Sequence, residues 1–303
     1  MSNILNIEID QKIKPEVEAF YDDDTGSFSY IVKDPSSSSC AIIDSVMDFD
    51  YASGAISYSG ANRIIDHIKS HGLKLEWLIE THIHADHLSA SYYLKSKLGG
   101  KIGIGKNITF VQHLFSKIFN TGDDFEKDGS QFDRLFEDGD AYKIGNMMAY
   151  AINTPGHTPA CMAHIIGDSA FVGDTIFMPD GGTARADFPG GDAGELYVSI
   201  EKVLSLPGNT RLFMCHDYPE NREVECQTTV AREKTENIHV HDGISKKQYE
   251  TIRESRDHSL EMPRLILPSL QVNMRAGKLP PAENNSMVYL KVPINAFIKV
   301  NSK

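Results

Sequence analysis

Three histidines and an aspartate in the run His82-Ile-His84-Ala-Asp86-His87 constrain this chain more than any other feature. Neutral imidazoles need hydrogen-bond partners and a carboxylate must be paired or solvated, so such a run is costly as ordinary packing. A divalent cation satisfies all of these groups, because imidazole and carboxylate ligands suit zinc, iron and manganese. A run this short does not fill a coordination sphere, so we expect further ligands from elsewhere in the chain.

Short apolar strands lead into the cluster and into the other candidate ligands. Loops that follow strands are where α/β proteins usually place their chemistry. Four predicted strands each end shortly before a candidate ligand: 75–79 before His82, 147–152 before His157, 169–172 before Asp174, and 211–214 before His216. A helix is predicted directly after the cluster, over 88–98, and ends at Gly99-Gly100.

Composition and charge limit what else the chain does. With 303 residues, 41% of them hydrophobic, it is long enough for a sizeable core in one large domain or two ordinary ones. A formal net charge of −12 argues against nonspecific binding to nucleic acid or to an anionic membrane. The N-terminus lacks the basic and apolar regions of a signal peptide, and no window approaches the roughly 20 apolar residues of a spanning helix. We therefore expect a soluble, cytoplasmic protein.

The remaining patterns outline the domain organisation. A hairpin is predicted from 29–32 and 41–43, and helices from 61–70 and 108–119. From Lys246 onward the pattern becomes helix, proline-containing loop and short strand. We interpret residues 1–240 as the catalytic domain and 241–303 as a C-terminal extension packed on it. The four cysteines form no CxxC pair and are expected to be buried or partly buried thiols.

The order of His82, His84, Asp86, His87, His157, Asp174 and His216 resembles the metallo-β-lactamase superfamily over about residues 25–220. The resemblance implies an α/β fold, the four-layer αβ/βα sandwich of two mixed sheets with helices on the outer faces. It places the metal at one edge of the sandwich, with Asp44 as a supporting group there.

Four local motifs narrow the resemblance to the persulfide dioxygenases, also called sulfur dioxygenases. They are the TPGHTP stretch around His157, the Arg185-Ala-Asp-Phe-Pro-Gly-Gly-Asp192 loop, His216-Asp-Tyr218, and Asn273-Met-Arg-Ala-Gly277. The resemblance implies one Fe(2+) per chain, held by His82, His157 and Asp174. Two histidines and one carboxylate leave coordination positions open for a sulfur ligand and dioxygen. The implied reaction oxidises the terminal sulfur of a persulfide, such as glutathione persulfide, with O2 to give sulfite and the thiol.

The other four groups of the pattern leave an alternative open. His84, Asp86, His87 and His216 either support the iron ligands or bind a second metal. In the second case the chain is a dinuclear zinc thioesterase of the glyoxalase II type, with Asp174 bridging two Zn(2+) ions. A non-enzymatic sulfur sensor is a third hypothesis, which an intact ligand set disfavours.

Arg185 and Tyr218 are the predicted substrate-binding residues. A guanidinium binds a carboxylate in a bidentate manner, and glutathione persulfide carries carboxylates. The competing interpretation pairs Arg185 with Asp187, and has Tyr218 orient His216. In the family an Asn-Pro-Arg stretch follows the last ligand, whereas this chain has Asn237-Ile-His239, so Arg222 and Arg275 are candidate replacements. Family members are often dimers, and we carry a homodimer as the corresponding expectation.

Overall fold

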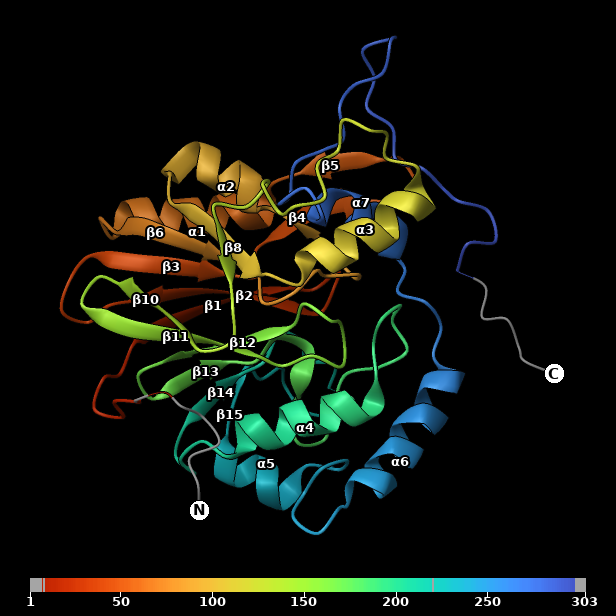
Figure 1. Ribbon diagram of the computed structural model, residues 1–303. Helices are drawn as coiled ribbons and strands as arrows, with labels where there is room; N and C mark the ends of the chain where they lie inside the picture. The colour runs from red at the N-terminus through yellow and green to blue at the C-terminus, as the bar shows by residue number, and fades with distance from the viewer. Residues whose placement is uncertain (1–6, 8, 220, 298–303) are drawn as a thin grey trace.

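The computed structural model describes residues 7, 9–219 and 221–297, and its centre is a pair of six-stranded sheets packed face to face (Figure 1). The first sheet is mixed, antiparallel from β1 to β3 and parallel from β3 to β9. Its strands, in spatial order, are β1 (Glu16–Asp22), β2 (Ser27–Lys33), β3 (Ser39–Ile43), β6 (Lys74–Ile79), β8 (Lys101–Gly105) and β9 (Arg134–Phe136).

The second sheet is also mixed, because β13 and β14 pair in parallel while the other neighbours are antiparallel. Its order is β10 (Asp140–Ile144), β11 (Met147–Asn153), β12 (Met162–Ile166), β13 (Ser169–Phe171), β14 (Arg211–Phe213) and β15 (Gln227–Thr229). A small third sheet joins β5 (Ala55–Ser57), β4 (Val46–Asp50) and β7 (Leu88–Ser89).

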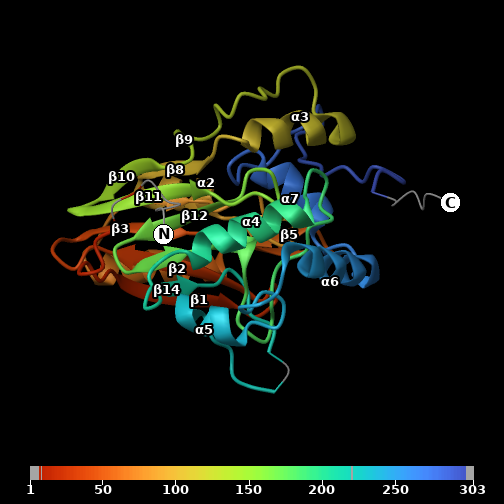
Figure 2. The same cartoon turned by 60° about the horizontal axis from the view of Figure 1, so that its bottom comes forward.

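Helices cover the outer face of each sheet, as Figures 1 and 2 show. On the side of the first sheet lie α1 (Ser59–Ser70), α2 (Ser91–Leu98), α3 (Ile108–Phe119) and α7 (Ile266–Asn273). On the side of the second sheet lie α4 (Ala193–Leu204), α5 (Val230–Glu236) and α6 (Lys246–Ser259). The predicted αβ/βα sandwich is confirmed. No helix in the described part of the chain is long and apolar enough to cross a membrane.

Aromatic side chains fill the space between the two sheets. Tyr30 of β2 is 2% exposed, and its ring centroid lies 5.4 Å from that of Phe171 and 5.5 Å from that of Phe213. The Tyr30 hydroxyl donates to the carbonyl of Met214, so its polar end is satisfied inside the core. Burial of apolar surface stabilises a fold by about 25 cal/mol per Å². The burial of these rings therefore holds β14 against the first sheet and fixes the position of the segment that follows it.

One predicted helix begins later than the sequence pattern indicates. The prediction of a helix over 88–98 is wrong at its start, because β7 pairs with Val46 and Met47 of β4 before α2 begins at Ser91. The Ser89 amide also donates 2.8 Å to the Asn273 side chain, a contact that local sequence does not reveal. At the first turn of the predicted helix, strand pairing therefore overrides the helical spacing of the apolar residues in 88–98.

The C-terminal segment forms two helices that pack on different sides of the sandwich. Helix α6 packs against α4, and α7 packs against β7 and α3. The short strand predicted after the proline-containing loop is not present in residues 274–297 of the described chain. The division into domains 1–240 and 241–303 stays a prediction.

Candidate metal centre

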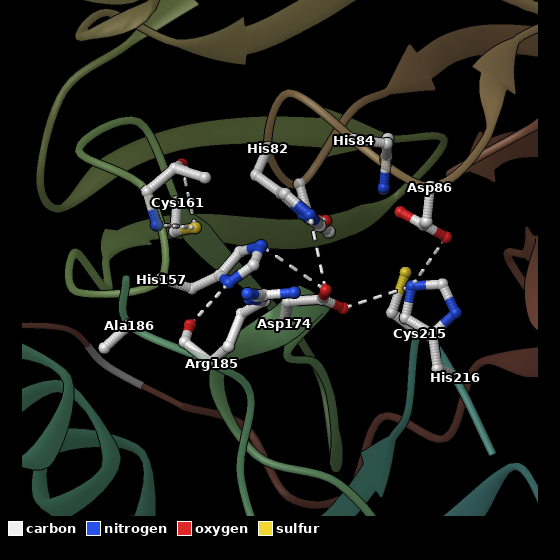
Figure 3. Close-up of polar contacts among 12 residues, drawn as sticks. His82, His84, Asp86, His157, Cys161, Asp174, Arg185, Ala186, Cys215 and His216 are labelled. Carbon is white, nitrogen blue, oxygen red and sulfur yellow. Dashed lines mark hydrogen bonds and ion pairs between the residues drawn. The ribbon is translucent and has the colours of Figure 1, made fainter. Parts of the chain in front are cut away.

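All four predicted ligand-bearing loops meet at one edge of the sandwich. His82 follows β6, His157 follows β11, Asp174 lies in the 3-10 turn Gly173–Thr175 after β13, and His216 follows β14. Figure 3 shows the Asp174 carboxylate in the middle, with His82 and His157 on one side and His216 on the other. Strand register thus brings residues from four separate loops around a single carboxylate.

His82, His157 and Asp174 form the first candidate metal site, with ligand atoms that lie within 4.8 Å of one another. The Nε2 atoms of His82 and His157 lie 3.7 and 3.5 Å from Oδ2 of Asp174. The three residues are only 1%, 5% and 7% exposed. The structure therefore brings together the three residues that the resemblance implied as ligands, in a buried group that could hold a metal.

The hydrogen bonds of the two imidazoles fix which nitrogen carries the proton. Nδ1 of His157 lies 2.7 Å from the carbonyl oxygen of Arg185, which only accepts, so Nδ1 is protonated and Nε2 has a free lone pair. The Thr81 hydroxyl donates to Asp44 at 2.8 Å and therefore accepts from Nδ1 of His82, 3.0 Å away. Both Nε2 lone pairs consequently face Asp174, the orientation in which histidine binds a metal.

Burial keeps His82 in the neutral form that a metal needs. Desolvation, together with the nearby imidazoles of His84 and His157, holds the pKa of His82 well below its usual value. Neither Nε2 of His82 nor Oδ1 of Asp174 has a hydrogen-bond partner among the described residues. Buried polar atoms without partners are costly, and a cation at this point removes the cost, so the residues fit a metal.

A second group lies on the other side of Asp174. Nε2 of His216 is 3.3 Å from Oδ1 of Asp174 and 3.3 Å from Oδ2 of Asp86, which in turn lies 3.2 Å from Nδ1 of His87. Ser27 of β2, which the sequence did not single out, places its hydroxyl 3.3 Å from Nδ1 of both His87 and His216. The Asp174 carboxylate therefore presents one oxygen to each group.

The ring of His84 lies beside that of His82, with the centroids 4.1 Å apart, but its Nε2 is directed to two acidic residues. Its Nε2 lies 3.0 Å from Oδ1 of Asp44 and 3.4 Å from Oε2 of Glu80. Burial alone disfavours a charged imidazole, but these two carboxylates raise the pKa of His84 well above its usual value. Asp44 lies where the resemblance implied, with a positive φ of 52°, whereas Glu80 was missed because one glutamate at a strand end carries no sequence signal.

The buried cysteines near the cluster behave as predicted. Burial raises the pKa of the Cys161 thiol to about 12, and that of Cys215 is raised well above its usual value. All four cysteines are free thiols. Although Cys215 lies within 4.8 Å of ligand atoms of Asp174 and His216, its thiol is protonated without a metal, and its Sγ lies 3.7 Å from Oδ2 of Asp44.

A cavity of about 930 Å³ opens over the cluster, lined by His157, Asp174 and His216 among others. Both predicted substrate-binding residues line it, but each already has partners. Arg185 makes a bidentate salt bridge with Asp187, at 2.6 and 3.0 Å. The Tyr218 hydroxyl lies 3.1 Å from Nδ1 of His216, and its ring stacks on that imidazole.

Of the two arginines considered as replacements, one lines the cavity and one does not. Arg222 lines it, but Asp217 and Asp180 bind its guanidinium at 2.6–2.9 Å. Arg275 lies outside the cavity lining and stacks on Phe125, 4.3 Å from the ring centroid. Both arginines therefore have structural partners in this arrangement.

Two facing mixed sheets, outer helices and a buried histidine–aspartate cluster at one edge define a metal-binding protein of the αβ/βα sandwich class. Comparison with known families agrees, since residues 22–216 match the model of the metallo-β-lactamase superfamily. The chain belongs to the metallo-β-lactamase superfamily, whose members are enzymes.

The chain is similar to several curated proteins over most of its length. It is 51% identical to a probable metallo-hydrolase of Burkholderia pseudomallei, covering 93% of this chain and 99% of that protein. It is 44% identical to glyoxylase B2 of Dictyostelium discoideum, covering 93% and 98%. Identity to the human mitochondrial persulfide dioxygenase is 30%, covering 84% and 86%. The chain spans 65% of the length of the β-lactamase hydrolase-like protein of Agrobacterium fabrum, at 49% identity.

Solved structures support the same family. The structure of ETHE1 from Myxococcus xanthus superposes with a TM-score of 0.69 at 25% sequence identity, and the match covers 87% of this chain and all of that one. Hydrolase-type and dioxygenase-type names both occur among the relatives. The chain is therefore a member of this metal-binding family.

Proposed function

We propose that the chain is an iron-dependent persulfide dioxygenase that binds one Fe(2+) through His82, His157 and Asp174. The observation that carries this proposal is the fixed orientation of the two imidazoles, whose Nε2 lone pairs converge on Asp174. A facial set of two histidines and one carboxylate suits non-haem Fe(2+). The 30% identity to the human persulfide dioxygenase over 84% of the chain supports the same assignment.

The proposed reaction consumes one dioxygen and one water for each persulfide and yields the thiol, sulfite and two protons. The terminal sulfur is oxidised, dioxygen is reduced, and the sulfur–sulfur bond breaks with the inner sulfur leaving as the thiol. A ferrous ion, when bound, supplies the redox chemistry that lets dioxygen react with a sulfur anion.

The protein's part is to orient the ligands and shape the site. The Arg185 carbonyl and the Thr81 hydroxyl hold His157 and His82 by their Nδ1 atoms. Burial of both imidazoles removes competing water from one side of the site. The 930 Å³ cavity on the other side gives room for a persulfide carried on a small thiol.

The alternative, a dinuclear zinc thioesterase, is favoured by the second group of residues. Within the described chain, Nδ1 of His84 and Nε2 of His87 and of His216 have no hydrogen-bond partner. These atoms and Asp86 provide ligands for a second cation, and the 44% identity to glyoxylase B2 fits a hydrolase. Two zinc ions would then share Asp174.

Metal analysis of protein purified anaerobically, without added zinc, separates the two functions. About one iron per chain, together with oxygen uptake on addition of glutathione persulfide, supports the dioxygenase. About two zincs per chain with hydrolysis of a glutathione thioester, and no oxygen uptake with any persulfide, would overturn it. His157→Ala is expected to lose both the metal and the activity, whereas the matched surface variant His113→Ala keeps both, since His113 is exposed on α3.

A further inference from the structure

Arginines line the cavity over the metal cluster, and most of them already bind carboxylates of the protein. Five arginines line it: Arg185, Arg222, Arg253, Arg256 and Arg264. A guanidinium binds a carboxylate through paired N–H groups that lie along one edge. An anionic substrate is expected to bind to an arginine whose paired N–H groups are not already bound by the protein.

Three of the five are occupied by acidic side chains or carbonyl groups of the protein. Arg185 is paired with Asp187, and its Nη1 donates 2.6 Å to the carbonyl of Glu261. Arg253 is 2% exposed and binds Asp257 and the carbonyl of Thr183. Arg222 is held by Asp217 and Asp180, as described above.

Arg256 and Arg264 differ from the other three. Both side chains are exposed, both line the cavity, and neither guanidinium makes a hydrogen bond or salt bridge with a described residue. Arg256 lies in the last turn of α6, and Arg264 lies in the segment between α6 and α7. Arg264 lies close enough to Asp50 to help lower the pKa of that carboxyl, but no hydrogen bond joins the two. Exposed guanidiniums on residues that line a cavity, without a hydrogen-bonded carboxylate, are suited to bind one from solution.

Acidic side chains also line the cavity, so it is expected to favour a ligand that carries positive as well as negative charge. Asp24 and Glu261 also line the cavity, and Glu261 stands between the two arginines in the sequence. A cavity lined both by these two guanidiniums and by carboxylates matches a ligand that carries two carboxylates and an ammonium group. A plain inorganic anion fits it less well, because the acids repel it.

Arg185 gains a different role from the one its residue type predicted. Its carbonyl oxygen accepts from Nδ1 of His157, and its guanidinium binds the carbonyl of Glu261. One residue therefore joins a metal-site histidine to the segment that carries Arg264. Arg185 is a positioning residue, and the anchoring of the substrate passes to the C-terminal segment.

We propose that Arg256 and Arg264 bind the carboxylates of the substrate's thiol carrier, a small zwitterionic peptide thiol with two carboxylates and one ammonium group. This inference rests on the proposed function for the identity of the reacting group, but not for the binding contacts. It explains how the chain manages without an arginine in the Asn237-Ile-His239 stretch. It also assigns a function to residues 256–264, outside the part that matches the family model.

Binding of glutathione to the full-length, metal-loaded protein under anaerobic conditions tests the proposal without turnover. By calorimetry, Arg256→Gln and Arg264→Gln are each expected to weaken binding about tenfold, as loss of one charged hydrogen-bonded contact does. Lys247→Gln is the matched control, because it removes the same charge from an exposed position on α6 outside the cavity, and binding is expected to change less than about twofold.

Chemical variation of the ligand identifies the contact. Glutathione esterified at its glycine carboxylate is expected to bind wild type about tenfold more weakly and to show no further loss with whichever arginine contacts that carboxylate. With glutathione persulfide, both variants are expected to raise KM and leave kcat unchanged, and a persulfide without carboxylates should not distinguish them from wild type.

The outcomes separate this inference from the proposed function. If wild type binds glutathione and both variants weaken it, but no persulfide drives oxygen uptake, the arginine site stands and the dioxygenase is wrong. If persulfide turnover is robust and the arginine variants leave KM and glutathione binding unchanged, the arginine site is wrong and the dioxygenase stands. Failure of wild type to bind glutathione also overturns the arginine site.

Discussion

The side-chain amide of Asn273 donates a hydrogen bond of 2.8 Å to the carbonyl oxygen of His87, although the two residues are 186 positions apart. The same amide donates 2.9 Å to the carbonyl of His84, and its oxygen accepts from the Ser89 amide. A single residue at the end of α7 therefore ties both ends of the histidine loop. The C-terminal segment is thus part of the support of the metal centre.

Replacing Asn273 with alanine is expected to loosen this loop. Three buried hydrogen bonds are lost. Because their backbone partners are left unsatisfied, the free energy of unfolding is expected to fall by about 1–3 kcal/mol. Denaturant unfolding and metal content measured together test this, and both are expected to fall. The exposed Asn285→Ala is the control; equal metal content in Asn273→Ala and wild type would show that α7 does not support the site.

Gly156 allows the loop before His157 to lie directly against α4. Its φ is 132°, and an added Cβ would overlap the backbone of Leu196. Gly156→Ala is expected to destabilise the fold by about 2–4 kcal/mol through backbone strain and overlap, and to lower metal binding. Gly243→Ala separates the two causes, because Gly243 also has a positive φ, of 100°, but open space around its Cβ position. Metal binding unaffected by Gly156→Ala would contradict this account.

The buried carboxylate of Glu80 contacts three side chains in or next to the histidine loop. Its carboxylate accepts hydrogen bonds from the hydroxyls of Ser89 and Ser91 and lies 3.4 Å from Nε2 of His84. Glu80→Ala is expected to cost about 1–3 kcal/mol of unfolding free energy, because buried donors lose their acceptor. Glu80→Gln keeps an acceptor and is expected to recover part of the loss. Thermal and denaturant unfolding measure both, with exposed Glu254→Ala as the control; equal losses for alanine and glutamine would argue against the hydrogen-bond explanation.

The buried His164 of β12 is expected to make the free energy of unfolding fall in acid, independently of the metal ligands. Burial lowers its pKa from 6.5 to about 4, and its Nδ1 lies 3.0 Å from the Tyr142 hydroxyl. Between pH 4 and pH 6.5, His164 is protonated in the unfolded chain but neutral in the folded chain. Its contribution to the free energy of unfolding is therefore fully present above pH 6.5 and is lost as the pH falls towards 4. A shift of this size corresponds to about 3 kcal/mol.

His164→Gln is the variant that isolates this titration. Its unfolding free energy is expected to depend less steeply on pH between 6.5 and 4 than that of wild type, while loss of metal at low pH affects both proteins alike. His113→Gln removes an exposed histidine and is expected to retain the wild-type slope. Identical slopes for wild type and His164→Gln would refute the assignment.

The sequence by itself determined which residues are candidate metal ligands and which superfamily they resemble. The histidines and aspartates carry their chemistry in their residue types, and each follows a short apolar strand whose end marks a loop. The local patterns predicted the strands and the loops that follow them, whereas the αβ/βα sandwich was implied by the resemblance of the ordered residues to a known superfamily. The start of α2 is the exception, since pairing of β7 with β4 prevails over helical periodicity there.

The tertiary structure decided which partner each polar group takes. Arg185 is near Asp187 in sequence, and the competing interpretation anticipated that pair, but its contact with Glu261 joins residues 76 positions apart. Glu80 and Asn273 gained their roles only when Ser89, Ser91 and the histidine loop were folded around them. A residue's type limits which bonds it can make, but burial and distance in the folded chain select among them, and these depend on segments remote in sequence.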